Sequence, residues 1–239
     1  MVFRLLCKGS SQRGCAQVLG VDPTTIARRI PRFSKCAKEH LRKLQSNLGH
    51  IKEVVFDEME TFEHTKLKPI TIPLAVENKT RKILSIEVGR IPAKGPLASL
   101  SRKKYGHRKC EKQNSLRRLF RSLESIPSDE RVFLSDQSTF YPPLMKTFRP
   151  STEHRTYKGR KAAIVGQGEL KKGGFDPLFS LNQTAAMLRD NIKRLTRKTW
   201  CTTKKVDRLL DFLVMYAFYH NQRIDGVKRP RMHNSTFTN

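Results

Sequence analysis

The stretch KEVVFDEMETF, Lys52–Phe62, decides how the fold of this chain is predicted. Its apolar run, Val54–Phe56, indicates a buried strand that leads directly into three acids, Asp57, Glu58 and Glu60. The chain has 48 Lys and Arg against 21 Asp and Glu, so a carboxylate cluster at a strand end needs an explanation. Two remain open: a solvated strand end, or a metal-binding active site whose partner carries the negative charge.

The formal net charge of +27 indicates a polyanionic partner, because so large a charge repels itself unless it is neutralised. Nucleic acid fits this role best, and an anionic membrane surface is the alternative. No apolar run approaches the roughly 18 residues that span a bilayer, and the N-terminus is too short for a secretory signal. The scattered cysteines, odd in number and without a CxxC pair, indicate reduced thiols and a cytoplasmic protein.

The first thirty residues predict two helices joined by a short turn. Ser11 is placed to cap the first helix, and Gly20 is placed to end it. Asp22 then caps the second helix, with Pro23 at its first position. The expected inward-facing residues are Cys15, Val18, Leu19, Ile26 and Ile30.

The open face of the second helix would carry Thr24, Thr25, Arg28 and Arg29, which is typical of a helix-turn-helix that contacts DNA. An ordinary helical hairpin is the alternative. We expect residues 31–50 to continue as basic helix, with a small helical domain over residues 1–49.

Strand and helix patterns alternate over the rest of the chain and predict an α/β fold. The expected strands are 52–59, 69–77, 81–89 and 131–137, and the expected helices are 114–126, 176–195 and 206–221. A three-strand meander followed by a crossover helix and a further strand predicts a mixed sheet flanked by helices, with its first and fourth strands side by side. Residues 92–112 are interpreted as a long basic loop.

Asp57 and Asp136 each end an apolar strand, so they converge if those strands are neighbours. Two adjacent carboxylates repel unless divalent cations lie between them, and Mg²⁺ prefers such hard oxygen ligands. The alternative is that Asp136 only starts a turn and Asp57 has no special role. Glu58 alternates with Asp57 along the strand, so we expect a surface or supporting position for it.

Three segments together resemble the catalytic segments of DDE-type transposases from bacterial insertion sequences: VVFDEMETF, FLSDQSTFY and LRDNIKRLTRKTWCTTKKVD. The resemblance spans about residues 5–222. It implies a ribonuclease H-like catalytic domain over residues 50–225 behind the helix-turn-helix domain, with a polar tail at residues 226–239. Similar transposases often carry a zinc ribbon before the helix-turn-helix, so we expect a subgroup without a ribbon or a shortened reading frame.

By this resemblance Asp57 and Asp136 match the first two catalytic acids. The third acid, a Glu in relatives, lies seven residues before Arg189, and that position here is Asn182. An amide oxygen can ligate Mg²⁺ or Mn²⁺, but it brings no charge and cannot act as a base. Glu169 and Asp176 are the alternative third ligands, although neither fits the register.

The resemblance implies a transposase that cuts DNA at the ends of its element and joins the released 3′-OH to target DNA. Residues 24, 25, 28 and 29 would lie nearest the major groove, and Arg189, Arg197 and Lys198 would hold phosphates, unless this segment is only a solvated helix face. A nucleoid-associated homo-oligomer on paired DNA ends is implied. A DNA-binding regulator or inactive remnant, and a nuclease without strand transfer, are the rival functions.

Overall fold

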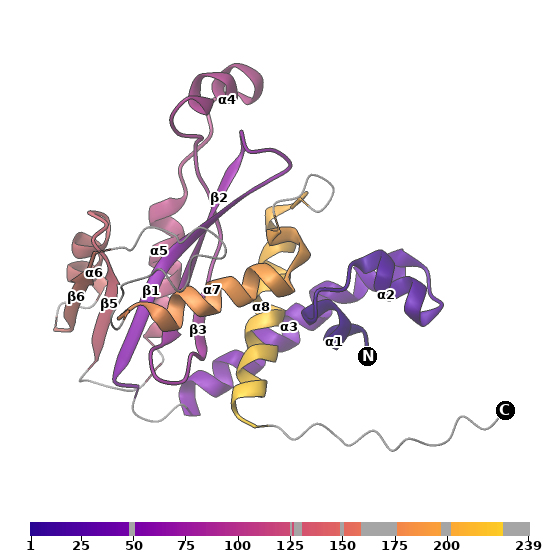
Figure 1. Cartoon of the computed structure of the whole chain (residues 1–239), viewed down its shortest axis with the longest axis horizontal. Coiled ribbons are helices and arrows are strands. Elements are labelled where there is room, and N and C mark those ends of the chain that lie inside the picture. Colours follow the sequence, from indigo (N-terminus) through magenta and orange to yellow (C-terminus); the bar gives the residue numbers. More distant parts are fainter. Residues whose placement is uncertain are drawn as a thin grey trace, which may run out of the picture.

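The computed structural model describes residues 1–47, 51–124, 126, 131–148, 151–158, 176–196 and 202–226, and its centre is a mixed sheet (Figure 1). The strands are β1 (Glu53–Phe62), β2 (Pro69–Glu77), β3 (Ile83–Ile86), β4 (Gly89–Arg90), β5 (Val132–Asp136) and β6 (Glu153–Tyr157). Their order is β3-β2-β1-β5-β6, and β4 pairs with β2. Because β1 is antiparallel to β2 and parallel to β5, the predicted mixed sheet and the predicted pairing of the first strand with strand 131–137 are confirmed.

Helices cover both faces of the sheet, which explains why almost every residue of β2 is buried. One face is covered by α7 (Phe179–Asn191) and α8 (Val206–Ile224), and the other by α5 (Lys112–Leu123) and α6 (Tyr141–Phe148). The alternation of β1 divides its side chains accordingly: Val55 and Met59 join the α7–α8 cluster, whereas Val54 and Phe56 join the α5–α6 cluster. Each face therefore has its own hydrophobic core.

The first helices form as their capping residues predict. They are α1 (Val2–Cys7), α2 (Gln12–Leu19) and α3 (Pro23–Asn47). Ser11 Oγ accepts from the Gly14 amide at 2.9 Å, and Asp22 Oδ1 accepts from the Thr24 amide at 2.7 Å. Gly20 ends α2 with a φ of 61°, a conformation that glycine adopts without strain. The α3 helix continues through Pro31, as the predicted extension beyond residue 30 requires.

One predicted core position in these helices is wrong. Val18 is 72% exposed rather than buried, because α2 packs through a narrow edge made by Cys15 and Ala16. Leu19 is only half-buried. The short helix has too few neighbours to cover a third apolar position, and Val18 is left on the surface.

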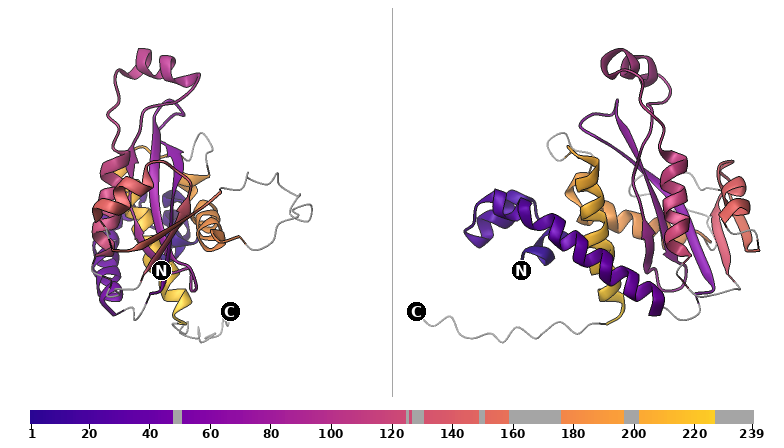
Figure 2. Two further views of the ribbon diagram at one scale, coloured as in Figure 1. Left: turned by 90° about the vertical axis from the view of Figure 1, so that its left-hand side faces the viewer. Right: turned by 180° about the vertical axis from the view of Figure 1, so that it is seen from behind.

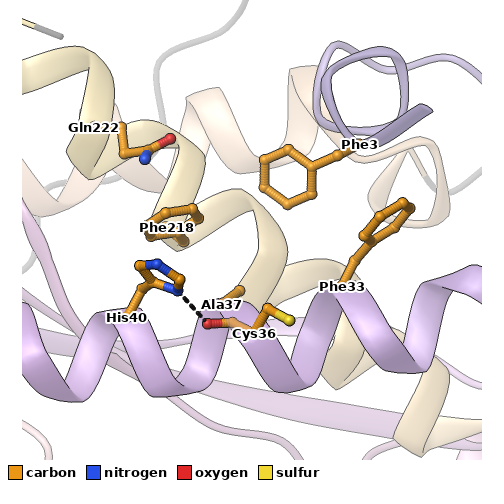
Figure 3. Close-up of a pocket in the computed structure, with 7 residues that line it drawn as sticks. All are labelled: Phe3, Phe33, Cys36, Ala37, His40, Phe218 and Gln222. Atoms are coloured by element: carbon orange, nitrogen blue, oxygen red, sulfur yellow. Dashed lines mark hydrogen bonds between the residues drawn. The ribbon is translucent and has the colours of Figure 1, made fainter. Parts of the chain in front are cut away.

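The N-terminal helices pack against α8, so they share the hydrophobic cluster of the α7–α8 face. Phe3, Phe33 and Phe218 bring α1, α3 and α8 together around a small hollow of about 310 Å³ (Figure 3). His40 also borders it, with its ring 5.0 Å from that of Phe218. None of the predicted site residues lines this hollow. The predicted domain boundary at residues 49–50 lies outside the described residues.

Two segments without predicted helix or strand contain regular structure. The expected basic loop includes a helix, α4 (Leu97–Tyr105), which projects beyond the sheet in every view (Figures 1 and 2). The Pro-bearing region after β5 forms α6, and β6 follows as an edge strand parallel to β5. Among the described residues, no helix combines the length and the hydrophobicity needed to cross a membrane.

Candidate functional site

The fold brings Asp57 and Asp136 to matching positions on neighbouring strands. Val55 of β1 pairs with Leu134 of β5, and each aspartate lies two residues further along its own strand. Residues two positions apart on a strand point to the same face of the sheet. Both aspartates therefore lie on the side of the sheet where Val55 and Leu134 pack. The convergence that the sequence predicts therefore occurs in the structure.

The environment of Asp57 favours its uncharged form. Burial, and to a smaller extent the negative charge of Asp136, raises the pKa of the Asp57 carboxyl to about 6. Two hydrogen bonds act in the opposite direction: the Glu58 amide donates to Asp57 Oδ1 at 2.7 Å, and the Tyr141 hydroxyl donates to the same atom at 2.9 Å. Two repelling carboxylates in a partly buried position suit a divalent cation between them.

Asp136 also has the turn role that was the alternative interpretation. The Ser138 amide donates to Asp136 Oδ1 at 2.9 Å, which stabilises the turn after β5. Ser135 anchors the strand end beside it, because its hydroxyl bonds the Asp136 carbonyl and His154 Nε2, each at 2.8 Å. The turn occupies one carboxylate oxygen, so the turn role and a ligand role are compatible.

Asn182 lies on the helix that covers this face of the sheet. Its neighbour Leu181 and Ala185, one turn further on, pack in the same cluster as Val55 and Leu134. The Asn182 side chain is exposed, and its amide nitrogen donates to Asp176 Oδ2 at 3.3 Å. This bond uses only the amide nitrogen of Asn182, and within the described residues no hydrogen bond joins Asn182 to Asp57 or Asp136.

The two alternative third ligands differ in what the structure says of them. Asp176 has a structural role in the turn that leads into α7, since its Oδ1 accepts from the Leu178 amide at 3.1 Å. Glu169 lies outside the described residues. Over the described ranges, no group of three or more His, Cys, Asp or Glu side chains could hold a metal ion. The described carboxylates that a cation between β1 and β5 would contact are Asp57 and Asp136.

Glu58 is not at the surface, because its side chain is only 7% exposed. Lys112, the first residue of α5, lies 2.6 Å from Glu58 Oε2, and the Thr71 hydroxyl donates to Oε1 at 2.8 Å. The Tyr141 hydroxyl that bonds Asp57 is also 3.2 Å from Glu58 Oε2. Glu58 thus supports the site from the α5–α6 side of the sheet.

Tyr141 and Lys112 are site residues that the sequence interpretation did not identify. Tyr141 is 1% exposed, and burial together with the charge of Asp57 raises its pKa, so the hydroxyl remains a donor. Tyr141 is the last residue of the segment FLSDQSTFY and follows Asp136 by five residues, so its closeness to this acid in the sequence was a usable signal. Lys112 gives no such signal, since only the folded sheet brings it to Glu58.

The other glutamates at the end of β1 also have basic partners. Lys94 lies 3.1 Å from Glu60, and Arg108 lies 3.0 Å from Glu63. Lys94 and Arg108 come from the connection between β4 and α5, and Lys112 is the first residue of α5. Within the described residues, neither Asp57 nor Asp136 forms an ion pair with a base.

The predicted DNA-contacting residues that the structure describes lie on α3 and α7. Thr24, Arg28 and Arg29 are exposed at the start of α3, and Thr25 is half-buried beside them. Arg189 is exposed on α7. The remaining predicted phosphate contacts, Arg197 and Lys198, lie outside the described residues.

Comparison of the chain with protein-family models and with curated proteins gives no match in either case. The site is therefore interpreted from its residues and from the resemblance of its segments alone.

Proposed function

We propose that this chain is a DNA transposase that binds element ends and catalyses metal-dependent strand cleavage and transfer. The observation that carries the proposal is the pair Asp57 and Asp136, at matching positions of two parallel strands and without a basic partner in the described residues. A helix-covered mixed sheet with paired acids at adjacent strands agrees with a ribonuclease H-like domain. The net charge of +27 agrees with a DNA substrate.

Asp57, Asp136 and the amide oxygen of Asn182 would hold Mg²⁺ or Mn²⁺. When bound, the cation would neutralise the carboxylates and activate the attacking oxygen of phosphodiester chemistry. Tyr141 would keep one oxygen of Asp57 in a fixed orientation through its 2.9 Å hydrogen bond. Asn182 would contribute an oxygen without accepting a proton, so any proton must leave through solvent or an aspartate.

Binding would use two surfaces. Thr24, Thr25, Arg28 and Arg29 at the start of α3 are proposed to read the terminal repeat in the major groove, because three of these side chains are exposed and Thr25 is half-buried. Arg189, Arg197 and Lys198 are proposed to hold phosphates near the catalytic face. A homo-oligomer on paired ends and association with the nucleoid belong to the same proposal.

A second candidate is a DNA-binding regulator that occupies the repeat without cutting it. It is favoured by one observation: the described residues hold no cluster of three His, Cys, Asp or Glu side chains, and the third position is the neutral Asn182. This candidate shares the helix-turn-helix proposal and differs only in the chemistry at the aspartates.

A nicking assay on DNA that carries the element ends separates the two candidates. We expect cleavage in Mg²⁺ or Mn²⁺ and a loss of at least about 100-fold in Asp57→Ala and Asp136→Ala, more than is typical for residues that only support a ligand. Glu60→Ala is the matched control, because it removes a carboxylate from the same strand. Binding without cleavage at any metal concentration would establish the regulator instead, and cleavage without joining would indicate a nuclease.

A further inference from the structure

The segment 94–109, here called the α4 arm, contains six Lys and Arg residues and no Asp or Glu. Its bases are Lys94, Arg102, Lys103, Lys104, Arg108 and Lys109. Two of them, Lys94 and Arg108, are paired with glutamates at the end of β1. The other four are exposed, and in the part of the chain that the structure describes none of them forms an ion pair with an acid.

The arm is attached to the sheet rather than loosely connected to it. Ser101 is buried and donates its hydroxyl to the Leu67 carbonyl at 2.7 Å, at the tip of the β1–β2 hairpin. The ammonium of Lys68 lies 4.5 Å from the centre of the Tyr105 ring. These contacts hold α4 beyond the end of the sheet, where Figures 1 and 2 show it projecting from the body.

One face of α4 combines long basic side chains with small ones. Ala98, Ser99, Arg102 and Lys103 share this face, because residues four apart lie one above another on a helix, and they line an open hollow of about 530 Å³. The small residues allow a partner to approach the helix closely, while the two cations lie beside it. An extended anion fits this combination.

We propose that the α4 arm binds the phosphate backbone of duplex DNA, next to the segment held at the aspartates. This inference rests on the proposed function and extends it to a surface outside both predicted DNA-contacting regions. At about 3.4 Å per residue, the strand from Asp57 to Phe62 is about 17 Å long. One DNA strand covers that distance in about five nucleotides, so a single duplex reaches from the aspartates to the arm.

A second copy of this chain is a less suitable occupant. It would bring the same uncompensated bases, and like charges at a contact oppose association. The exposed leucines of the arm, Leu97 and Leu100, lie on the side of α4 opposite to Arg102, because each residue advances the helix by about 100°.

The test is the affinity of the full chain for a fluorescent duplex of about 30 base pairs and arbitrary sequence, measured by anisotropy between about 50 and 200 mM salt. The arm variant combines Arg102→Gln, Lys103→Gln and Lys104→Gln. We expect its dissociation constant to rise roughly 10- to 100-fold, and the slope of log affinity against log salt to become shallower by about 2 to 3, since each lost phosphate contact contributes about 0.9.

The matched control removes three exposed bases from α5 and α6, the helices that cover the sheet face opposite to α7 and α8: Arg117→Gln, Arg121→Gln and Lys146→Gln. Both variants lose the same formal charge, so a smaller effect in the control assigns the loss to the arm. Equal affinities for the two variants would overturn the inference. A change in oligomeric mass by sedimentation, without a change in DNA affinity, would overturn it in favour of a second copy.

Failure of the arm and failure of the proposed function give different results. If wild type binds and nicks DNA but the arm variant binds equally well, only the arm inference is wrong. If the arm variant loses affinity but no preparation nicks DNA, the arm inference holds and the catalytic proposal is wrong.

Discussion

The acids at the end of β1 form two groups with opposite electrostatics. Glu58, Glu60 and Glu63 each lie within 3.1 Å of a base from the segment that runs from β4 into the start of α5. Asp57 instead lies beside another carboxylate, Asp136, which helps to raise its pKa. Adjacent residues of one strand therefore differ in whether the fold itself supplies the positive charge.

The comparison suggests how to separate structural acids from functional ones. An acid that is neutralised by a nearby base stabilises the fold and needs no ligand. A carboxylate pair that the fold leaves without a base costs stability, and such a cost is expected where an external cation is to bind. The glutamates of the acidic cluster are thus held in ion pairs, whereas Asp57, beside Asp136 of the neighbouring strand, has no basic partner among the described residues.

The largest effect on stability is expected from Lys112→Met. This change leaves Glu58 as a buried charge with only hydroxyl partners, which we expect to lower the free energy of unfolding by about 2–4 kcal/mol. Urea denaturation measures the change. The double variant Lys112→Met/Glu58→Gln should recover most of the loss, because the unpaired charge is gone. A single variant as stable as wild type would show that the pair is not structural.

Asp57→Asn tests the other group, and it should stabilise the fold. The folded chain keeps the Asp57 proton up to about pH 6, whereas the carboxyl has a pKa of 3.8 without the fold. Between these values the folded state binds more protons, so wild-type stability falls as pH rises, and the loss is complete above about pH 6. At pH 7 the variant should be more stable by about 1–3 kcal/mol.

Magnesium provides the control for this prediction. If the aspartates bind the cation, Mg²⁺ should raise the unfolding midpoint of wild type at pH 7 and leave Asp57→Asn nearly unchanged. A wild-type stability that rises between pH 4 and 6, relative to the variant, would contradict the raised pKa.

The sequence predicts the aspartate pair because a buried strand and its terminal acid are both local patterns. Val54–Phe56 and Phe133–Ser135 indicate strands, and the order of elements makes those strands neighbours. The ion pairs are not local: Lys112 reaches Glu58 only through the fold of the connecting segment. No short pattern could have separated Glu58 from Asp57 by its partner.

Two missed elements show where periodicity fails. The α4 helix has only Leu97 and Leu100 as large aliphatic residues, and both are exposed, so it carries no buried stripe to detect. The β6 strand, EHRTY, is polar because, in the described part of the chain, it lies at the edge of the sheet and pairs with β5 alone. Hydrophobic patterns report burial, and neither element is mainly buried.

Tyr141→Phe affects both groups of acids, since the hydroxyl that it removes contacts both Asp57 and Glu58. We expect a loss of about 1 kcal/mol in the free energy of unfolding, typical of one buried hydrogen bond. Nicking should fall roughly 10- to 100-fold through misorientation of Asp57, as for other residues that hold a ligand in place. A lower metal affinity with an unchanged fold by circular dichroism would distinguish positioning from general damage, whereas unchanged nicking would remove Tyr141 from the site.

The smallest effect is expected at the outermost ion pair, Lys94 with Glu60. Their side chains are 68% and 54% exposed, so water and salt screen the attraction. Lys94→Ala should change the free energy of unfolding by less than about 0.5 kcal/mol, well below Lys112→Met, although both remove a base from a β1 glutamate. The same urea denaturation series measures both variants. Equal losses would mean that burial does not control the value of these pairs, and the contrast between the two groups of acids would then need another cause.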